Sequence, residues 1–353
     1  MIVLLLGCEA ELNQDTQMLT FDPFEQGEWD VAADDGHFIS RHGIEHDVYM
    51  WYPTRQDDSI EDEDKIRYGD FVPGGVWDGG LPQCSTHRPV VMFSHGNMGM
   101  SFQSFFLMEH LASHGYIVVA PDHVGNTYLD NDESRKPELI FRRPEDISDA
   151  FDWLVNESKL KECVDSNGGY AIVGHSFGGY TALALSGAII DTEATLNHCD
   201  QFGGWLCEHV QTWSNDYGSG LYDRSDQRVW AGIPLTPAAY ETLIGGLDNI
   251  SIAQQVWGGG WDDLTGVSDV IRPIYQALTA EKSMAVVEEA GHYSFTNACQ
   301  IVSTYPDCEE PFLSTEEVHY LVNGFATSFL AEQRGIKGWE DFVLEKEEHI
   351  LWE

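Results

Sequence analysis

The chain has 353 residues, of which 42% are hydrophobic, and it carries 59 Asp and Glu against 18 Lys and Arg, for a formal net charge of −41. This length and hydrophobic content are sufficient for one large domain or two modest ones with a packed core, and they exclude a chain that is disordered throughout. A surface with this excess of negative charge repels nucleic-acid phosphates and anionic lipid, so the composition excludes a nucleic-acid-binding function.

The first residues resemble part of an export signal. Residues 1–7 are apolar and lead into Cys8 through the sequence LLGC, which resembles a bacterial lipobox, where the cysteine carries the lipid. The basic start and the longer apolar region of a complete signal are missing. We therefore expect residues 1–28 to be a truncated export or lipoprotein signal with an acidic tether. Residues 29–353 are expected to form one domain that is secreted, periplasmic or lipid-anchored at the cell surface.

Strands alternate with helices along most of this domain. A strand is expected at Val48–Tyr52, closed by Pro53, and then an acidic connection at 56–88 whose loop 57–64 lacks the spacing of a calcium-binding EF-hand. The elements expected next are strands at 89–94, 116–120, 170–173, 229–235, 250–257 and 284–288, and helices at 102–114, from Pro144, at 178–188 and from Thr315. This alternation predicts a mostly parallel, doubly wound α/β sheet with helices on both faces. Residues 189–224 break the alternation and predict an inserted, cap-like segment.

Six cysteines besides Cys8 predict disulfide bonds, because an even number in an exported chain is typical of a disulfide framework. The pairs Cys199/Cys207 and Cys299/Cys308 are close in sequence, which leaves Cys84 and Cys163 for a long-range pair. Sequence alone leaves the other pairings open. None of the six has the spacing of a zinc site, so no metal is expected.

A glycine-rich motif follows the strand expected at 170–173. The sequence GHSFGG at 174–179 has the G-x-S-x-G pattern between a strand and a helix, the context that places a serine on a strained turn. Side chains at Gly174 and Gly178 would collide with neighbouring backbone in such a turn. The motif therefore predicts that Ser176 is a catalytic nucleophile at a helix N-terminus, which favours developing negative charge.

A nucleophilic serine needs a base, and the base needs a carboxylate that orients it. His292 lies in a loop just after the strand expected at 284–288. In doubly wound hydrolases the three groups follow the chain order Ser, acid, His, so His292 is the predicted base. The strand that ends at Trp257 leads through three glycines and a Trp to Asp262 and Asp263. Either of these two can be the acid, and the other is then a helix N-cap.

Backbone amides near the predicted nucleophile can stabilise an oxyanion. The His-Gly turn after the strand at 89–94 would supply the amide of Asn97, and the turn at Ser176 would supply the amide of Phe177. His123, at the end of the next strand, is a candidate to touch substrate, with a role in shaping its loop as the alternative. Aromatic side chains of the insertion are further candidates to line the pocket, namely Phe202, Trp205 and Trp213.

Taken together, these motifs resemble a known family. The stretches GHSFGG, FSHGNMG, LASHGYIVVAPDH, VYMWYP and AGHYSF are similar to those of the serine-dependent platelet-activating factor acetylhydrolase and dienelactone-hydrolase-like branch of the α/β-hydrolases, over roughly Val48 to Gly335. In such hydrolases the acid sits three residues beyond a strand-end Gly, with a Thr three residues further on. The run 259–265 therefore favours Asp262, although Gly266 stands where a Pro would follow.

The resemblance implies the α/β-hydrolase fold and a secreted carboxylic ester hydrolase that uses a Ser-Asp-His triad and an acyl-enzyme, without metal or cofactor. Its partner would be a small-molecule or polymeric ester, and we expect a monomer. Dienelactone hydrolases use Cys where this chain has Ser176, and the insertion at 189–224 has no counterpart, so the substrate stays open. An amidase or peptidase of the same fold and a non-catalytic binding module are the alternatives.

Overall fold

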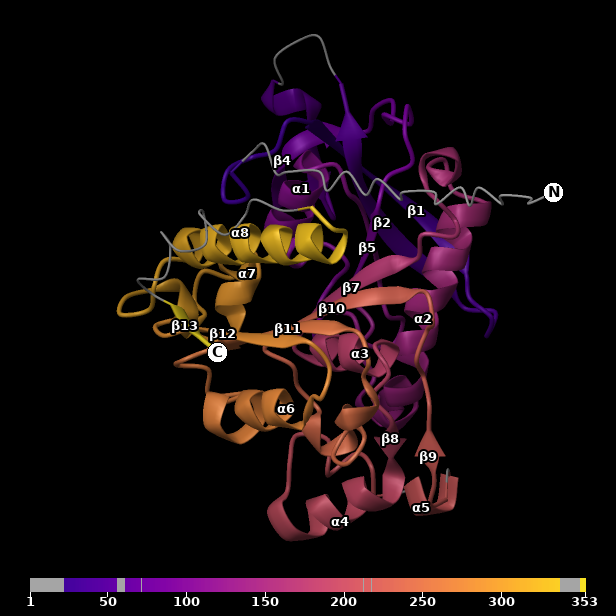
Figure 1. The fold of residues 1–353 in the computed structure, drawn as a ribbon, viewed down its shortest axis with the longest axis vertical. Coiled ribbons are helices and arrows are strands. Elements are labelled where there is room, and N and C mark those ends of the chain that lie inside the picture. Colours follow the sequence, from indigo (N-terminus) through magenta and orange to yellow (C-terminus); the bar gives the residue numbers. More distant parts are fainter. Residues whose placement is uncertain (1–21, 56–60, 71, 212, 217, 337–349) are drawn as a thin grey trace, which may run out of the picture.

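A mixed sheet of eleven strands forms the centre of the molecule (Figure 1). The computed structural model describes residues 22–55, 61–70, 72–211, 213–216, 218–336 and 350–353. The strand order is β13-β12-β11-β10-β7-β5-β6-β2-β1-β4-β3, and β8 and β9 form a separate pair. The strands are β1 (Asp30–Ile39), β2 (Glu45–Thr54), β3 (Lys65–Tyr68), β4 (Val72–Asp78), β5 (Val90–Ser94), β6 (Ile117–Pro121), β7 (Tyr170–His175), β8 (Ile190–Asp191), β9 (Leu221–Tyr222), β10 (Val229–Leu235), β11 (Ala253–Gly259), β12 (Lys282–Val287) and β13 (Ile350–Trp352).

The strands from β6 to β12 across the middle of the sheet run parallel, while β2 and β13 flank them in the antiparallel direction. The sequence of strand β5 is almost wholly apolar. Val91 and Phe93 belong to the core on one face of the sheet, and Val90 and Met92 belong to the core on the other face. Both faces are buried, so a run of consecutive apolar residues is needed. The expected doubly wound, mostly parallel sheet is confirmed.

Helices cover both faces of the sheet (Figure 1). Helices α1 and α8 pack against one face, and α2, α3 and α6 against the other. The helices are α1 (Phe105–Ser113), α2 (Lys136–Asn156), α3 (Phe177–Leu185), α4 (Thr192–Phe202), α5 (Trp213–Asp216), α6 (Arg272–Ala277), α7 (Ala298–Ile301) and α8 (Thr315–Gln333). No helix in the described ranges is long and apolar enough to cross a membrane.

Two prolines lie inside elements although the sequence predicts a boundary at each: the start of a helix at Pro144 and the end of a strand at Pro53. Helix α2 begins at Lys136 and contains Pro144. Proline cannot donate to the carbonyl of Ile140, but Tyr180 Oη donates to that carbonyl instead, at 2.7 Å, so the helix continues. Strand β2 continues through Pro53, whose carbonyl accepts a bond from the Gln83 amide on the side away from β1. The missing N–H therefore faces away from the ladder with β1.

Two further segments differ from the sequence expectation. The connection at 56–88 contains strands β3 and β4, and part of its acidic loop, residues 56–60, lies outside the described residues. The tether expected up to residue 28 ends earlier, because Phe24 is 3% exposed and its ring packs on Phe325 of α8. Residues 1–21, including Cys8, lie outside the described residues.

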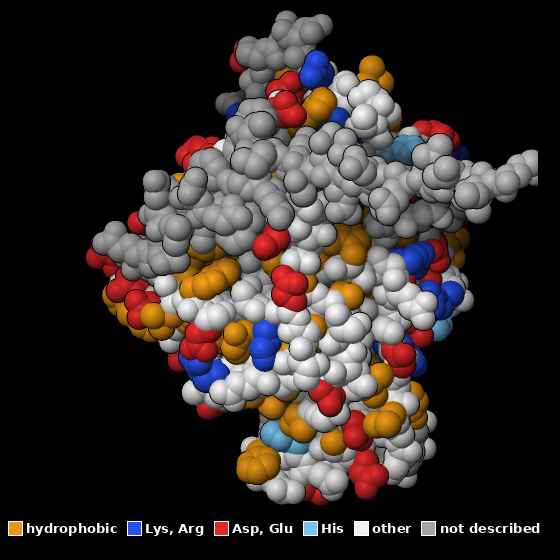
Figure 2. Space-filling view, viewed as in Figure 1, with side chains coloured by type: hydrophobic (Ala, Val, Ile, Leu, Met, Phe, Trp, Pro, Cys, Tyr) orange, Lys and Arg blue, Asp and Glu red, His pale blue; other side chains and the backbone are white. Residues whose placement is uncertain are grey.

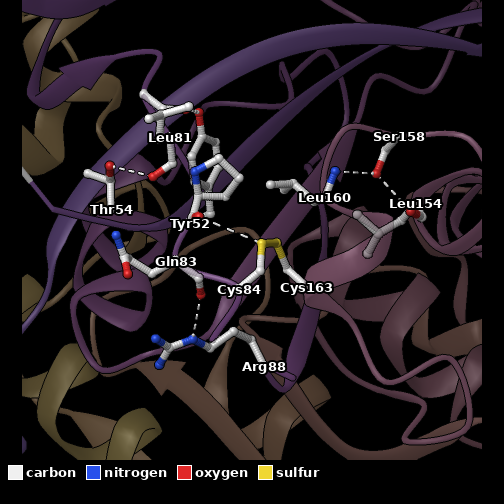
Figure 3. Close-up of a disulfide and its surroundings, with 12 residues drawn as sticks. Tyr52, Thr54, Leu81, Gln83, Cys84, Arg88, Leu154, Ser158, Leu160 and Cys163 are labelled. Atoms are coloured by element: carbon white, nitrogen blue, oxygen red, sulfur yellow. Dashed lines mark hydrogen bonds between the residues drawn. A yellow bond between two sulfur atoms is a disulfide. The ribbon is translucent and has the colours of Figure 1, made fainter. Parts of the chain in front are cut away.

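The three disulfides expected from cysteine spacing are present: Cys84–Cys163, Cys199–Cys207 and Cys299–Cys308. Figure 3 shows the first, which joins the segment before β5 to the short helix η3 (Lys161–Cys163) behind α2. It closes the longest loop, with a sequence separation of 79 residues. In the chain-entropy view such a loop contributes about 4.5 kcal/mol, against roughly 2.5 kcal/mol for each of the short ones.

The insertion expected at 189–224 forms β8, α4, α5 and β9 at one end of the molecule (Figure 1). Its Leu206, Val210 and Trp213 are fully buried in the core that also contains Phe141 of α2. Acidic side chains are scattered over the described surface in the view of Figure 2, and hydrophobic ones are exposed around the α4 end. The insertion is therefore packed onto the sheet domain as part of its core.

We expect acid to destabilise this fold, because many histidines are buried in the neutral form. Burial lowers the pKa of His110 and His175 to about 3 and of His319 to about 4, and it also lowers the pKa values of His46, His95, His114 and His123. Below the unfolded pKa of about 6.5, unfolding therefore takes up protons. Burial raises the pKa of Glu109 to about 7, of Asp122 to about 6 and of Asp146 to about 8, which acts in the opposite direction on fewer groups.

A net uptake of about two protons corresponds to about 3 kcal/mol per pH unit. Urea unfolding at pH 7.5, 6.5 and 5.5 measures this slope above the sequence pI of 4.3, where the protein keeps its negative charge. The free energy of unfolding should fall below pH 6.5. A flat or rising free energy between pH 6.5 and pH 5.5 would contradict the prediction.

Candidate active site

Ser176 occupies a strained turn between β7 and α3. Its backbone has φ 57° and ψ −116°, a left-handed φ that is costly for any residue except glycine. A Cβ added at Gly178 would lie 1.8 Å from the Ser94 carbonyl oxygen, and one at Gly174 would lie 2.1 Å from the Gly178 carbonyl oxygen. The turn therefore needs both glycines, as the G-x-S-x-G pattern predicts. Ser176 keeps 9% of its surface exposed.

The loops after β11 and β12 bring a carboxylate to His292. Nδ1 of His292 donates to Oδ2 of Asp262 at 2.8 Å, and both side chains are almost fully buried. The neighbouring Asp263 is exposed to solvent. Of the two carboxylates that the sequence left open, Asp262 is thus the one that contacts His292. The sheet brings the pair together, because β11 and β12 are parallel neighbours whose carboxyl ends lie at the same edge.

Asp262 is held in its ionised form. The backbone amides of Leu264 and Thr265 each donate to Oδ1 at 2.8 Å, and the Thr265 hydroxyl donates to Oδ2 at 2.7 Å. Burial by itself would raise the pKa of Asp262, but the bond with His292, the charge of its imidazolium and the Thr265 donors outweigh burial and lower the pKa to about 2. A fixed anion at this position stabilises an imidazolium at His292.

Ser176 lies next to both the base loop and the turn after β5. Its neighbour His175 bonds to the backbone oxygen of His292 at 2.9 Å, and the two imidazole rings are 4.8 Å apart. A Cβ added at Gly96 would lie 3.4 Å from Ser176 Cβ. No hydrogen bond joins Ser176 Oγ to His292 in the part of the chain that the structure describes. Such bonds are often long without substrate and tighten when it binds.

The turn after β5 contains the predicted oxyanion residue Asn97. The Gly99 amide donates to the Gly96 carbonyl at 3.1 Å, and Met98 between them has φ 56°. The Asn97 side chain accepts a bond from Asn126 at 2.8 Å, which ties this turn to the loop after β6. Phe177 is the first residue of α3, so its amide precedes the first acceptor within the helix. The two predicted oxyanion amides thus belong to the residue after Ser176 and to the residue after Gly96, whose backbone comes close to Ser176.

A buried arginine, which the sequence patterns did not indicate, lies behind this turn. Arg143 of α2 is fully buried and donates to Asn126 Oδ1 at 2.6 Å and to the backbone oxygen of His95. Its guanidinium also stacks on the Phe177 ring, 4.5 Å from the ring centroid. Arg143 therefore contacts the Phe177 ring directly and is linked to Asn97 through Asn126. A lone Arg in an amphipathic helix is usually read as a surface residue, so only the packing shows this contact.

The three candidate pocket residues of the insertion differ in exposure and in the rings that they contact. Trp205 is 39% exposed and meets the Phe177 ring edge to face at 5.1 Å, so it reaches the turn that carries Ser176. Trp213, predicted to line the pocket, is fully buried and packs on Phe141. Phe202 is 76% exposed at the end of α4, and its ring contacts His198. Of the three, only Trp205 has a ring contact with Phe177: Trp213 is buried in the core, and the ring contact of Phe202 is with His198.

His123, also predicted to touch substrate, lies beneath the surface. Its Nε2 is 2.9 Å from Ser94 Oγ and its Nδ1 is 2.9 Å from Asp146 Oδ2, and all three side chains are fully buried. The spacing is that of a catalytic triad, but no side chain in it is open to substrate. Both ring nitrogens are already engaged, so His123 stabilises the loop after β6, which was the alternative for this residue.

The described residues include no group of three or more His, Cys, Asp or Glu side chains placed to hold a metal ion.

Comparison with known proteins gives partial sequence matches. A family model described as Chlorophyllase matches residues 80–199, which include the turn after β5 and Ser176. The chain is 30% identical to Cutinase 2 of Thermobifida cellulosilytica over 142 residues, 39% of this chain and 49% of that protein. It is 32% identical to Chlorophyllase-1 of Arabidopsis thaliana over 108 residues, 30% of this chain and 31% of that protein. The chain thus spans about half or less of these relatives.

Structural similarity extends over nearly the whole chain. A ferulic acid esterase from Streptomyces cinnamoneus superposes with a TM-score of 0.64 at 18% sequence identity, covering 92% of this chain and 95% of that chain. The chain has the α/β-hydrolase fold. This conclusion concerns the architecture, and it agrees with the parallel sheet, the turn at Ser176 and the order of Ser176, Asp262 and His292 along the chain.

Proposed function

We propose that this chain is a serine-dependent carboxylic ester hydrolase, with Ser176 as nucleophile, His292 as base and Asp262 as orienting acid. The observation that carries the proposal is the buried bond of 2.8 Å between His292 Nδ1 and Asp262 Oδ2 beside the strained turn of Ser176. The partial matches to cutinases and chlorophyllases support an ester as the substrate. The finer resemblance to the platelet-activating factor acetylhydrolase and dienelactone-hydrolase-like branch stays a prediction.

The proposed reaction is acyl transfer in two halves. His292 Nε2 takes the proton of the Ser176 hydroxyl while Oγ attacks the ester carbonyl carbon. The carbonyl oxygen becomes an oxyanion, to which the amides of Phe177 and Asn97 donate. The imidazolium, held by Asp262, then gives its proton to the departing alcohol and leaves an acyl-enzyme. Water repeats the sequence on the acyl-enzyme and releases the carboxylic acid.

The extracellular location is part of the proposal. Three disulfides support export, since such bonds persist outside the reducing cytosol. A lipid anchor at Cys8 is also part of the proposal, and Cys8 lies outside the described residues. Mass spectrometry of the protein recovered from an expressing bacterium would show whether Cys8 carries a lipid.

Trp205 points to esters with a bulky apolar or aromatic group. Its exposed indole stands on Phe177, whose amide is a proposed oxyanion donor. Trp261 and Met98, on the loops after β11 and β5, are also 40% and 42% exposed. Aromatic and apolar side chains around a reaction centre bind apolar substrate groups by burying their surface. We therefore propose that the insertion supplies the wall against which such a group packs.

Hydrolysis of p-nitrophenyl acetate, butyrate and octanoate tests the function and this wall together. The wild type should release p-nitrophenol, and a serine-reactive phosphonate should stop the release. Trp205→Ala should raise KM for the octanoate about tenfold or more, because several buried CH₂ groups lose their contact at about 0.8 kcal/mol each. Turnover of the acetate should change by less than threefold.

Phe202→Ala is the matched control, because it removes an exposed aromatic side chain from the same insertion but away from Phe177. Equal effects of the two substitutions on the octanoate would contradict the proposed wall. Hydrolysis of the matching anilides but not of the esters would contradict an esterase and favour an amidase.

A further inference from the structure

The side chain of Gln103 bridges two loops of the candidate active site. The Gly96 amide donates to Gln103 Oε1 at 3.0 Å, and Gln103 Nε2 lies 3.0 Å from Nδ1 of His175. His175 Nε2 in turn lies 2.9 Å from the backbone oxygen of His292. Three hydrogen bonds thus run without a break from the turn that bears the proposed oxyanion amide to the backbone of the proposed base.

In each of these three hydrogen bonds, only one of the two groups can be the donor. A backbone N–H is always a donor, so the Gly96 amide fixes Oε1 of Gln103 as the acceptor. The Nε2 of Gln103 then donates to His175, so Nδ1 of that ring carries a lone pair. Its proton must sit on Nε2, from which it donates to the His292 carbonyl. The arrangement therefore requires neutral His175 in one tautomer.

We propose that Gln103 and His175 are positioning residues that hold the base loop and the oxyanion turn in one fixed geometry around Ser176. This inference rests on the proposed function. The two residues touch neither the Ser176 hydroxyl nor the proposed oxyanion amides directly. They act by fixing Gly96, which precedes Asn97, and the backbone oxygen of His292. Catalytic groups must be held within a fraction of an ångström of their productive geometry, and side chains with engaged hydrogen bonds provide this.

Two glycines of the turn leave the space that the Gln103 carboxamide and the His175 ring occupy. A Cβ added at Gly99 would lie 2.0 Å from Gln103 Oε1, and one at Gly96 would lie 3.2 Å from His175 Nδ1. Any other residue at position 99 would displace Gln103. The backbone of Gln103 is fixed as well, because its carbonyl accepts from the Asn297 amide at 2.7 Å, five residues beyond the base. The bridge therefore joins the two loops through both its backbone and its side chain.

The neutral state of His175 matters for the reaction. Burial, helped by the nearby charge of His292, lowers the pKa of His175 to about 3. An imidazolium forms at His292 during the proposed reaction, and its ring is 4.8 Å from that of His175. A second positive charge at that distance would oppose it. A neutral histidine can donate to the His292 carbonyl without adding this repulsion.

Kinetics of Gln103→Leu test the positioning role. This substitution keeps the side-chain bulk and removes both bonds, so we expect kcat for p-nitrophenyl butyrate to fall about 10- to 100-fold while KM changes by less than threefold. Gln255→Leu is the matched control, because Gln255 is also buried and also bridges two groups, the Phe325 carbonyl and the Trp257 indole, neither of which belongs to the chain of bonds through Gln103 and His175. A kcat for Gln103→Leu within twofold of that of Gln255→Leu would overturn the proposal.

Nitrogen NMR of the histidine-labelled wild type shows which ring nitrogen of His175 carries the proton. This measurement needs neither enzyme activity nor a folded variant. In the wild type at pH 7.5, His175 should carry its proton on Nε2 and none on Nδ1. In Gln103→Glu, a carboxylate oxygen faces Nδ1, so a proton should appear there. A wild-type His175 protonated on Nδ1 overturns the relay. If the wild type neither hydrolyses esters nor reacts with a phosphonate, the proposed function fails, while the tautomer still decides whether the relay exists.

Discussion

Ser176→Ala should reduce kcat for ester hydrolysis on the order of 10⁶-fold and leave the protein folded. The proposed nucleophile, base and acid would act as one proton-transfer unit, so the loss of one member should remove nearly the whole effect, and adding His292→Ala should cost little more. Residual turnover above that in water would come from the oxyanion amides of Phe177 and Asn97, whose positions the substitution leaves intact.

The measurement is p-nitrophenyl butyrate hydrolysis by the single and double variants, with thermal unfolding as the check on folding. Alanine is close to serine in its backbone preferences, so the cost of φ 57° at this position changes little. The wild type should react covalently with a phosphonate at Ser176, as mass spectrometry of the tryptic peptide would show. A Ser176→Ala enzyme within tenfold of wild type, or labelling at another serine, would contradict the assignment.

Asp262→Asn should lower kcat about 10⁴-fold, whereas Asp263→Asn should change it by less than threefold. The bonds around position 262 explain the difference. Oδ1 accepts from two backbone amides, so an asparagine there keeps its oxygen on that side and turns its NH₂ group toward His292. An NH₂ donor facing Nδ1 forces the imidazole proton onto Nε2, which can then no longer take the proton from Ser176.

Asp263→Asn is the matched control, because it makes the same chemical change one residue away on an exposed side chain. The pH dependence offers a second check. Because the pKa of Asp262 is lowered to about 2, its carboxylate stays charged above about pH 4, so no loss of kcat from protonation of Asp262 should appear in that range. If Asp263→Asn loses most of its kcat while Asp262→Asn stays near wild type, then Asp263 and not Asp262 is the acid.

The local sequence determined much of this protein. Short apolar runs such as Val90–Ser94 are typical of strands buried on both faces, and the alternation of such runs with helices predicts a parallel sheet. The GHSFGG motif predicts the turn at Ser176, because glycines are needed where a side chain would strike backbone within a few residues. Cysteine spacing predicted the three disulfides. Each of these features depends on neighbours in sequence or on a simple periodicity.

The tertiary structure alone decided the rest. Whether Asp262 or Asp263 reaches His292 depends on the backbone angles of a loop, and adjacent side chains in a turn point in different directions. Trp205 and Trp213 look alike in the sequence, but one stands on Phe177 and the other fills the core. Helix α2 continues past Pro144 because Tyr180, from helix α3, donates to the Ile140 carbonyl in place of the missing N–H.

The supporting residues of the site were the hardest to foresee. No motif specifies Arg143 or Gln103, and His175 occupies a variable position of G-x-S-x-G, because each of the three has a backbone oxygen or amide among its partners, which any residue could provide. A sequence pattern records the side chains that a position requires, and a backbone partner leaves no such record. What holds the oxyanion turn and the base loop together therefore becomes visible only once β5, β7 and β12 have brought their carboxyl ends to one edge of the sheet.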